Sequence, residues 1–130
     1  MIEYRVAPKL ENEALNSLFS AAWGSLSDND FQPVLKHSLS YVGAFAEERL
    51  IGFVNLAWDG GVHAFLLDTT VHPAWQRRGI GQKLVRLALR IAKEQGMIWV
   101  HVDFEPHLKK FYEGCGFCPT EAGLYSCITE

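Results

Sequence analysis

Residues 73–82, with the sequence PAWQRRGIGQ, place two arginines and two glycines directly before an amphipathic helical pattern. The first amide N–H groups of a helix lack partners within the helix and carry a partial positive charge. Ser, Thr, Asp or Asn usually satisfies them, and residues 73–82 contain none of the four. Gly79 and Gly81 allow a tight turn and let a ligand approach the amides closely. The turn therefore predicts an anion site, with phosphate or pyrophosphate as the ligand.

The charges around this turn favour the same interpretation. No Asp or Glu occurs between Thr69 and Lys93, although the whole chain has a net charge of -3. The basic residues in this stretch are Arg77, Arg78, Lys83, Arg86, Arg90 and Lys93. The alternative is a solvated basic helix face after an ordinary loop. A P-loop fits poorly, because Gln82 and Lys83 follow Gly81 where that motif needs a lysine and a hydroxyl residue.

The elements that position this turn follow from hydrophobic periodicity and from breakers. We predict strands at 2–7, 41–47, 50–58, 62–71 and 97–103, helices at 11–23, 30–37, 79–95 and 106–113, and two short strands after Gly116. Strand 62–71, helix 79–95 and strand 97–103 form a crossover unit with parallel strands. The fold class is α/β (α+β), a single domain over residues 1–130 with a mixed, mostly antiparallel central sheet flanked by helices.

Two motifs resemble the GNAT N-acetyltransferase superfamily. Gln76 to Gly81, QRRGIG, is similar to the family's acyl-CoA motif Q/R-x-x-G-x-G/A, and FYEGCGF at 111–117 is similar to its helix-to-strand signature. The resemblance covers nearly the whole chain and implies the GNAT fold. It implies acetyl-CoA as co-substrate, with backbone amides of Arg77, Arg78, Gly79, Ile80, Gly81 and Gln82 around the pyrophosphate. It also implies that Val71 pairs its backbone with the pantetheine arm.

The reaction that the resemblance implies is direct acetyl transfer to a primary amine, without a covalent enzyme intermediate. Tyr112 matches the family's tyrosine, and at a pKa of ~10 its hydroxyl is a workable proton donor to the departing CoA thiolate. The alternative role for Tyr112 is a packed aromatic ring with a backbone partner for its hydroxyl. A backbone N–H near Val71 is expected to meet the oxyanion.

The residue that accepts the amine proton is not fixed by the sequence, and Asp68 is the candidate, with either a functional or a structural role. This carboxylate stands in an otherwise apolar strand, three residues before Val71. It either takes the proton or fixes a cationic substrate, or it is a paired structural carboxylate. His63, His101 and Asp103 lie on strands that could face the same cleft, but surface or core roles are expected for them. The family has no single fixed base, and Glu105 departs from the asparagine that many members carry at its position.

Other patterns limit the remaining functions. The pair Cys115 and Cys118 is expected to be neither a redox nor a zinc site, because Cys115 ends a helix instead of beginning one. We predict no metal, no nucleic-acid partner and no membrane association, and three clustered cysteines indicate a reducing cytoplasm. The family suggests a homodimer, and it places Trp23 and Phe31 at an acceptor pocket for apolar or aromatic amines. The alternative to an enzyme is a non-catalytic acyl-CoA-binding or sensing domain.

Overall fold

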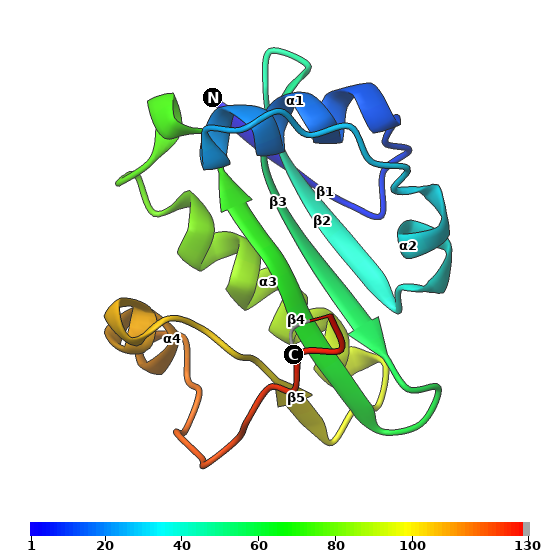
Figure 1. The fold of residues 1–130 in the computed structure, drawn as a ribbon, viewed down its shortest axis with the longest axis vertical. Helices are drawn as coiled ribbons and strands as arrows, with labels where there is room; N and C mark the ends of the chain where they lie inside the picture. Colours follow the sequence, from blue (N-terminus) through cyan, green and yellow to red (C-terminus); the bar gives the residue numbers. More distant parts are fainter. Residues whose placement is uncertain (129–130) are drawn as a thin grey trace.

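The computed structural model describes residues 1–128, in which a mixed sheet lies between two helical layers (Figure 1). The strands stand in the order β1 (Ile2–Val6), β2 (Ser40–Ala46), β3 (Arg49–Trp58), β4 (His63–Val71) and β5 (Trp99–His101). Pairs β1–β2, β2–β3 and β3–β4 are antiparallel, and β4–β5 is parallel. The predicted mixed, mostly antiparallel sheet is confirmed.

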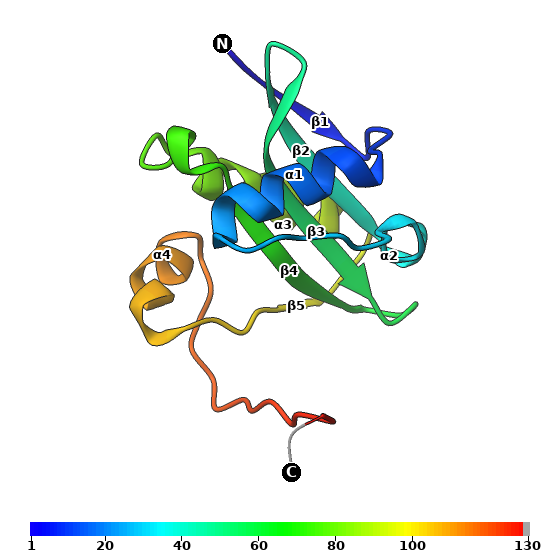
Figure 2. The same cartoon turned by 45° about the horizontal axis from the view of Figure 1, so that its top comes forward.

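The helices cover both faces of this sheet (Figure 2). On one face, α1 (Asn12–Trp23) buries Leu15, Leu18 and Phe19 against the sheet, and α2 (Gln32–His37) lies beside it. On the other face, α3 (Ile80–Glu94) buries Ile80, Leu84, Val85, Ala88 and Ala92. This spacing of three and four residues is what an amphipathic helix needs to present one apolar stripe.

A shorter helical region leads into the second family motif. It consists of the 3-10 turn η2 (Pro106–Leu108) and α4 (Lys109–Gly114). Arg86 of α3 donates a hydrogen bond to the carbonyl of Gly114 over 3.2 Å, which ties α4 to α3. Tyr112 and Cys115 join the core on this side of the sheet. The predicted helix at 106–113 is therefore present, with a 3-10 start.

Two sequence predictions at the C-terminal side are wrong. The expected strand 97–103 is only Trp99–His101, because β5 pairs with β4 over three residues, His63 to Phe65, and then leaves it. The two short strands expected after Gly116 are absent from residues 117–128, which have no strand partner. Leu124 and Tyr125 there are 81% and 90% exposed. Strand propensity alone does not make a strand without a neighbouring edge to pair with.

The end of β4 that approaches the predicted site is irregular. Its register with β3 shifts between Phe53 and Asn55, and Asp68 at this bulge has a φ of 59°. β4 runs on to Val71, six residues beyond Phe65, its last residue that pairs with β5. A bulge twists the strand and re-aims its side chains. The two parallel strands therefore diverge toward the turn that precedes α3.

Candidate active site

The turn between β4 and α3 is tight at Gly79, as the sequence predicts, whereas Gly81 already lies within α3 and Arg77 takes a left-handed conformation that the sequence did not indicate. Arg77 and Gly79 have φ values of 63° and 78°, both in the left-handed region. Gly79 is the N-cap of α3, without a side-chain cap, and the first turn of α3 contains no acidic residue. The first amides of α3 thus lack side-chain acceptors, and the helix start keeps its partial positive charge.

A cavity of about 770 Å³ joins this turn to β4 and α4. Eight of the ten predicted site residues line it: Val71, Gln76, Arg77, Gly79, Ile80, Gly81, Gln82 and Tyr112. Thr69, Trp23, Trp75, His107, Leu108 and Phe111 complete the lining. Arg77 and His107 are its ionisable residues besides Tyr112, and no carboxylate is among the described lining residues. The cavity therefore suits an elongated ligand that carries anionic groups at the turn and apolar groups further in.

Two predicted site residues, Arg78 and Asp68, are not part of this lining. The guanidinium of Arg78 lies over the ring of Trp75, 4.9 Å from its centroid. This cation–π contact holds Arg78 and Trp75 together on the turn. The role implied for the Arg78 amide remains a prediction, and its side chain stabilises the turn.

Gln76 has a side-chain contact that the motif alone did not indicate. Its Nε2 donates a hydrogen bond to the carbonyl oxygen of Val71 over 3.1 Å. The same carbonyl belongs to the strand end that is expected to pair with the pantetheine arm. Gln76 thereby fastens the turn to the last residue of β4 and sets the distance between the two predicted ligand contacts.

Tyr112 lines the cavity although only 7% of its surface is exposed. Its ring packs against Phe104, Phe111 and Phe117, with centroid separations of 4.9, 4.9 and 5.8 Å. Burial raises the pKa of the Tyr112 hydroxyl, and a hydrogen bond with Thr69 acts in the opposite direction. The phenol therefore keeps its proton at neutral pH, as a proton donor must.

Asp68 lies on the bulge of β4 with an exposed side chain. Within the described residues, no hydrogen bond or ion pair engages its carboxylate, and Thr70 donates only to its backbone carbonyl over 3.0 Å. Partial desolvation nevertheless raises the pKa of the carboxyl group. The paired structural carboxylate considered from the sequence is therefore wrong, and a role in proton transfer or substrate binding stays a prediction.

Several lining residues were not identified from the sequence as ligand contacts. Thr69 and Trp75 flank predicted positions, and His107, Leu108 and Phe111 lie on η2 and α4. Thr69 carried one usable signal, since it is two residues before Val71 and alternate strand residues share a face. Of the two expected pocket aromatics, Trp23 lines the cavity, whereas Phe31 packs on Phe19 at 5.3 Å.

The remaining candidates lie outside the cavity lining. His63 and His101 contact each other, with 2.8 Å between Nδ1 and Nε2, across the short β4–β5 pairing. Cys115, Cys118 and Cys127 are free thiols, and burial raises the pKa of Cys115. Within residues 1–128, no group of three or more His, Cys, Asp and Glu side chains is arranged to hold a metal ion. None of the helices in this part of the chain is long and apolar enough to span a bilayer.

Comparison with known proteins agrees with the geometry. The family model described as "Acetyltransferase (GNAT) family" matches residues 9–117. An uncharacterized ycf52-like N-acetyltransferase of Prochlorococcus marinus is 29% identical over 119 residues, 88% of this chain and 65% of that protein. The match to the first curated relatives spans between 35 and 65% of their length.

Solved structures share the fold over nearly the whole chain. A GNAT family acetyltransferase from Streptococcus pneumoniae has a TM-score of 0.75 at 25% identity, covering 96% of this chain and 98% of that one. A Trypanosoma brucei acetyltransferase has a TM-score of 0.84 at 17% identity, covering 98% and 100%, and shows the fold alone. The matched residues 9–117 include both the uncapped start of α3 and Tyr112. This chain therefore belongs to the acetyltransferase (GNAT) family.

Proposed function

We propose that this chain is an acetyl-CoA-dependent N-acetyltransferase that moves the acetyl group directly to a primary amine of a small molecule or peptide. One observation carries the proposal: a single cavity connects the uncapped start of α3 to the buried hydroxyl-bearing residue Tyr112. An anion site at one end and a proton donor at the other match the two ends of an acyl-CoA thioester.

Each part of the cavity has a role in this reaction. The amides around Gly79 and Gly81 bind the pyrophosphate, and the diverging end of β4 near Val71 aligns the pantetheine arm. Attack by the neutral amine forms the C–N bond and expels the thiolate as the C–S bond breaks. Tyr112 then gives its proton to the thiolate and is reprotonated from solvent, while Asp68, through water, accepts the proton that the amine loses.

The position of Asp68 favours keeping a second candidate, a non-catalytic acyl-CoA-binding domain. Asp68 is absent from the cavity lining, so a base in direct reach of the amine is not among the described lining residues. Turnover decides between the two functions, because both require the same cavity but only one needs proton transfer.

The test is release of free CoA thiol from acetyl-CoA in the presence of a panel of aliphatic, aromatic and amino-sugar amines. We expect amine-dependent thiol release with at least one class of amine. Saturable binding of acetyl-CoA without release for every amine supports the binding domain instead. If acetyl-CoA does not bind at millimolar concentration, both functions are wrong.

A further inference from the structure

The turn between β4 and α3 has little packing of its own. Pro73, Ala74 and residues 76–79 are exposed, and within this turn Arg77 and Gly79 adopt left-handed backbone conformations. A left-handed residue other than glycine is uncommon and has an energetic cost, so the conformation of this turn depends on the hydrogen bonds that hold it. The amides proposed to bind pyrophosphate are therefore positioned by a few local contacts.

His72, the residue after β4, makes most of these contacts. Its backbone N–H donates to the Ile51 carbonyl over 2.8 Å, and its own carbonyl accepts from the Trp75 amide over 2.8 Å. Its ring Nδ1 accepts a hydrogen bond from the Ala74 amide over 3.1 Å, which caps the 3-10 turn η1 (Pro73–Trp75). His72 thus connects the sheet to the beginning of the turn through both backbone and side chain.

The other ring nitrogen of His72 faces a second donor. Nε2 lies 3.0 Å from the guanidinium Nη2 of Arg49, at the start of β3. A neutral imidazole has one N–H and one acceptor nitrogen, whereas the Ala74 amide and the Arg49 guanidinium can only donate. Each neutral tautomer therefore satisfies one of the two contacts, and the protonated ring satisfies neither.

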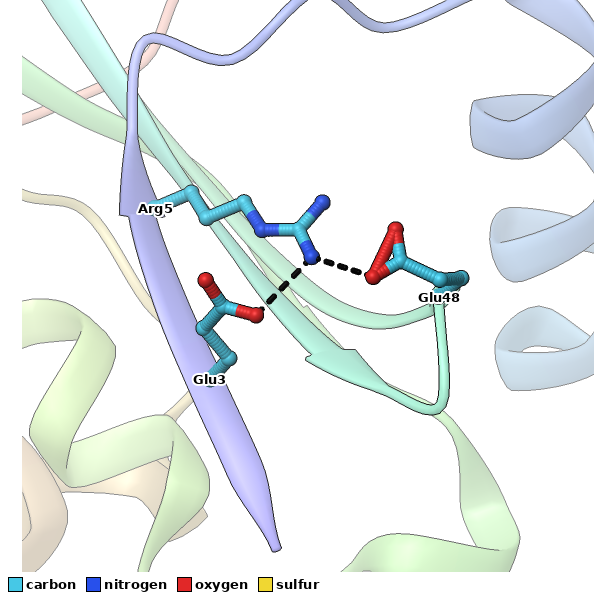
Figure 3. Close-up of polar contacts among 3 residues, drawn as sticks. All are labelled: Glu3, Arg5 and Glu48. Atoms are coloured by element: carbon cyan, nitrogen blue, oxygen red, sulfur yellow. Dashed lines mark hydrogen bonds and ion pairs between the residues drawn. The ribbon is translucent and has the colours of Figure 1, made fainter.

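No carboxylate pairs with Arg49 among the residues that the structure describes. Glu48, the preceding residue, has its carboxylate bound by Arg5 over 2.7 Å, and Arg5 also pairs with Glu3 at 2.9 Å (Figure 3). Further along the turn, the guanidinium of Arg78 lies over Trp75. A proton on His72 would place a second positive charge 3.0 Å from Arg49. In agreement, burial and the charge of Arg49 lower the pKa of His72.

We propose that His72 is a positioning residue whose neutral ring caps the β4–α3 turn and so sets the backbone amides that bind acetyl-CoA. This inference rests on the proposed function, because it concerns the same ligand. Protonation of the ring removes the Ala74 cap and repels Arg49, so the turn loosens in acid. Acetyl-CoA affinity then falls as the pH drops below the ordinary histidine value of ~6.5 toward the lower value in the folded protein.

The test compares His72→Asn, His72→Ala and Arg49→Gln by calorimetric titration with acetyl-CoA at pH 7.5 and at pH 5.5. Loss of a capping acceptor in His72→Ala should raise Kd roughly two- to tenfold at pH 7.5. Asparagine still offers a capping oxygen but does not titrate, so His72→Asn should bind like the wild type and lose the weakening at pH 5.5. Arg49→Gln removes the repelling charge, so the onset of weakening should move to higher pH.

Two further readouts separate a positioning role from a loss of folding. The KM for acetyl-CoA should rise in His72→Ala while kcat at saturation changes little, because His72 is not among the described residues that line the cavity. In the wild-type protein without ligand, the Ala74 amide resonance should titrate together with the His72 imidazole nitrogens.

The outcomes distinguish this inference from the proposed function. If the wild type binds acetyl-CoA and His72→Ala binds equally well at both pH values, His72 has no positioning role. An Ala74 amide that is insensitive to His72 titration also overturns the capping mechanism. If neither the wild type nor any variant binds acetyl-CoA while the Ala74 amide follows His72, the cap exists, but the proposed function and the link to ligand affinity are both wrong.

Discussion

At the scale of single residues, Tyr112 unites a buried ring with a place in the cavity wall. Its aromatic neighbours hold the ring, so removing only the hydroxyl should leave the packing intact. Burial raises the pKa of that hydroxyl, and the group therefore loses its proton only when the pH rises beyond the usual tyrosine value of ~10. Proton donation by Tyr112 should accordingly be constant across the neutral range.

The variant Tyr112→Phe should lower kcat about 100-fold, because general-acid assistance is worth two or more powers of ten. The KM for acetyl-CoA should change little, and loss of the hydroxyl should lower the free energy of unfolding by about 1 kcal/mol at most. Steady-state kinetics and urea denaturation measure these effects. Tyr41→Phe is the matched control, since Tyr41 also has a raised pKa but donates to Pro8 outside the cavity. Full turnover in Tyr112→Phe at saturating substrate would remove Tyr112 from the chemistry.

Asp68 differs from Tyr112 because its carboxylate is exposed and unpaired within the described residues. Asp68→Asn keeps the left-handed backbone that asparagine tolerates well, and it removes the proposed base. We expect kcat/KM at pH 7 to fall on the order of 100-fold. The raised pKa places the acid limb of the wild-type profile above the ordinary carboxyl value of ~3.9, and that limb should vanish in the variant.

The stability of Asp68→Asn provides a check on folding. A raised pKa means that the folded state disfavours the ionised Asp68 carboxylate. The free energy of unfolding therefore falls as the pH rises through the pKa of Asp68 and the carboxyl group loses its proton. At pH 7 the asparagine variant should be at least as stable as the wild type by urea denaturation. Asp28→Asn, at an exposed position outside the cavity lining, is the control for charge alone. An unchanged acid limb in Asp68→Asn would show that another group is the base.

At the scale of elements, the start of α3 combines a left-handed glycine with uncapped amides. Gly79 at the beginning of α3 and Gly96 after its end have φ values of 78° and 86°, and a Cβ at either would meet nothing within 4 Å. The two positions therefore have the same backbone requirement, and only Gly79 lines the cavity. This pair separates the cost in folding from the cost in binding.

Gly79→Ala and Gly96→Ala should each lower the free energy of unfolding by roughly 1–2 kcal/mol, the cost of a left-handed non-glycine residue. Only Gly79→Ala should also raise the Kd for acetyl-CoA, because a shifted backbone at that position turns the ligand-binding amides away. Urea denaturation and titration calorimetry measure the two quantities. Equal Kd values for both variants would place the pyrophosphate elsewhere.

At the scale of the whole molecule, one cavity joins three elements that are distant in the sequence. Thr69 on β4, Gly81 on α3 and Tyr112 on α4 line one cavity. A ligand that spans them binds the folded state and not the unfolded chain. It must therefore raise the stability of the entire domain.

Acetyl-CoA at one hundred times its Kd should stabilise the fold by about 2.7 kcal/mol. For a chain of this length that corresponds to a rise in Tm of roughly 10 °C. Differential scanning fluorimetry measures the shift, with free adenine as a control ligand that lacks the pyrophosphate and thioester. A shift with adenine as large as that with acetyl-CoA would contradict recognition through the turn.

The sequence alone was sufficient to predict those features that depend on residues close together in the chain. The two glycines and the missing caps and acids around them predicted the turn before α3, because backbone conformation and helix-end electrostatics depend on neighbouring residues. Hydrophobic periodicity located the helices and the first four strands, and two spaced motifs indicated the family. Eight of the ten predicted site residues accordingly lie in one cavity.

Only the tertiary structure decided what depends on partners distant in the chain. β5 is short because β4 diverges from it, and the segment after Gly116 is not a strand because it has no edge to pair with. The bulge that exposes Asp68 and the contact of Thr69 with Tyr112 are likewise set by neighbouring elements. His72 shows the same limit, since its conflict between Ala74 and Arg49 arises only when β3 lies beside the end of β4. Periodicity reports which face of an element is buried, whereas strand pairing and side-chain partners are determined when the elements pack together.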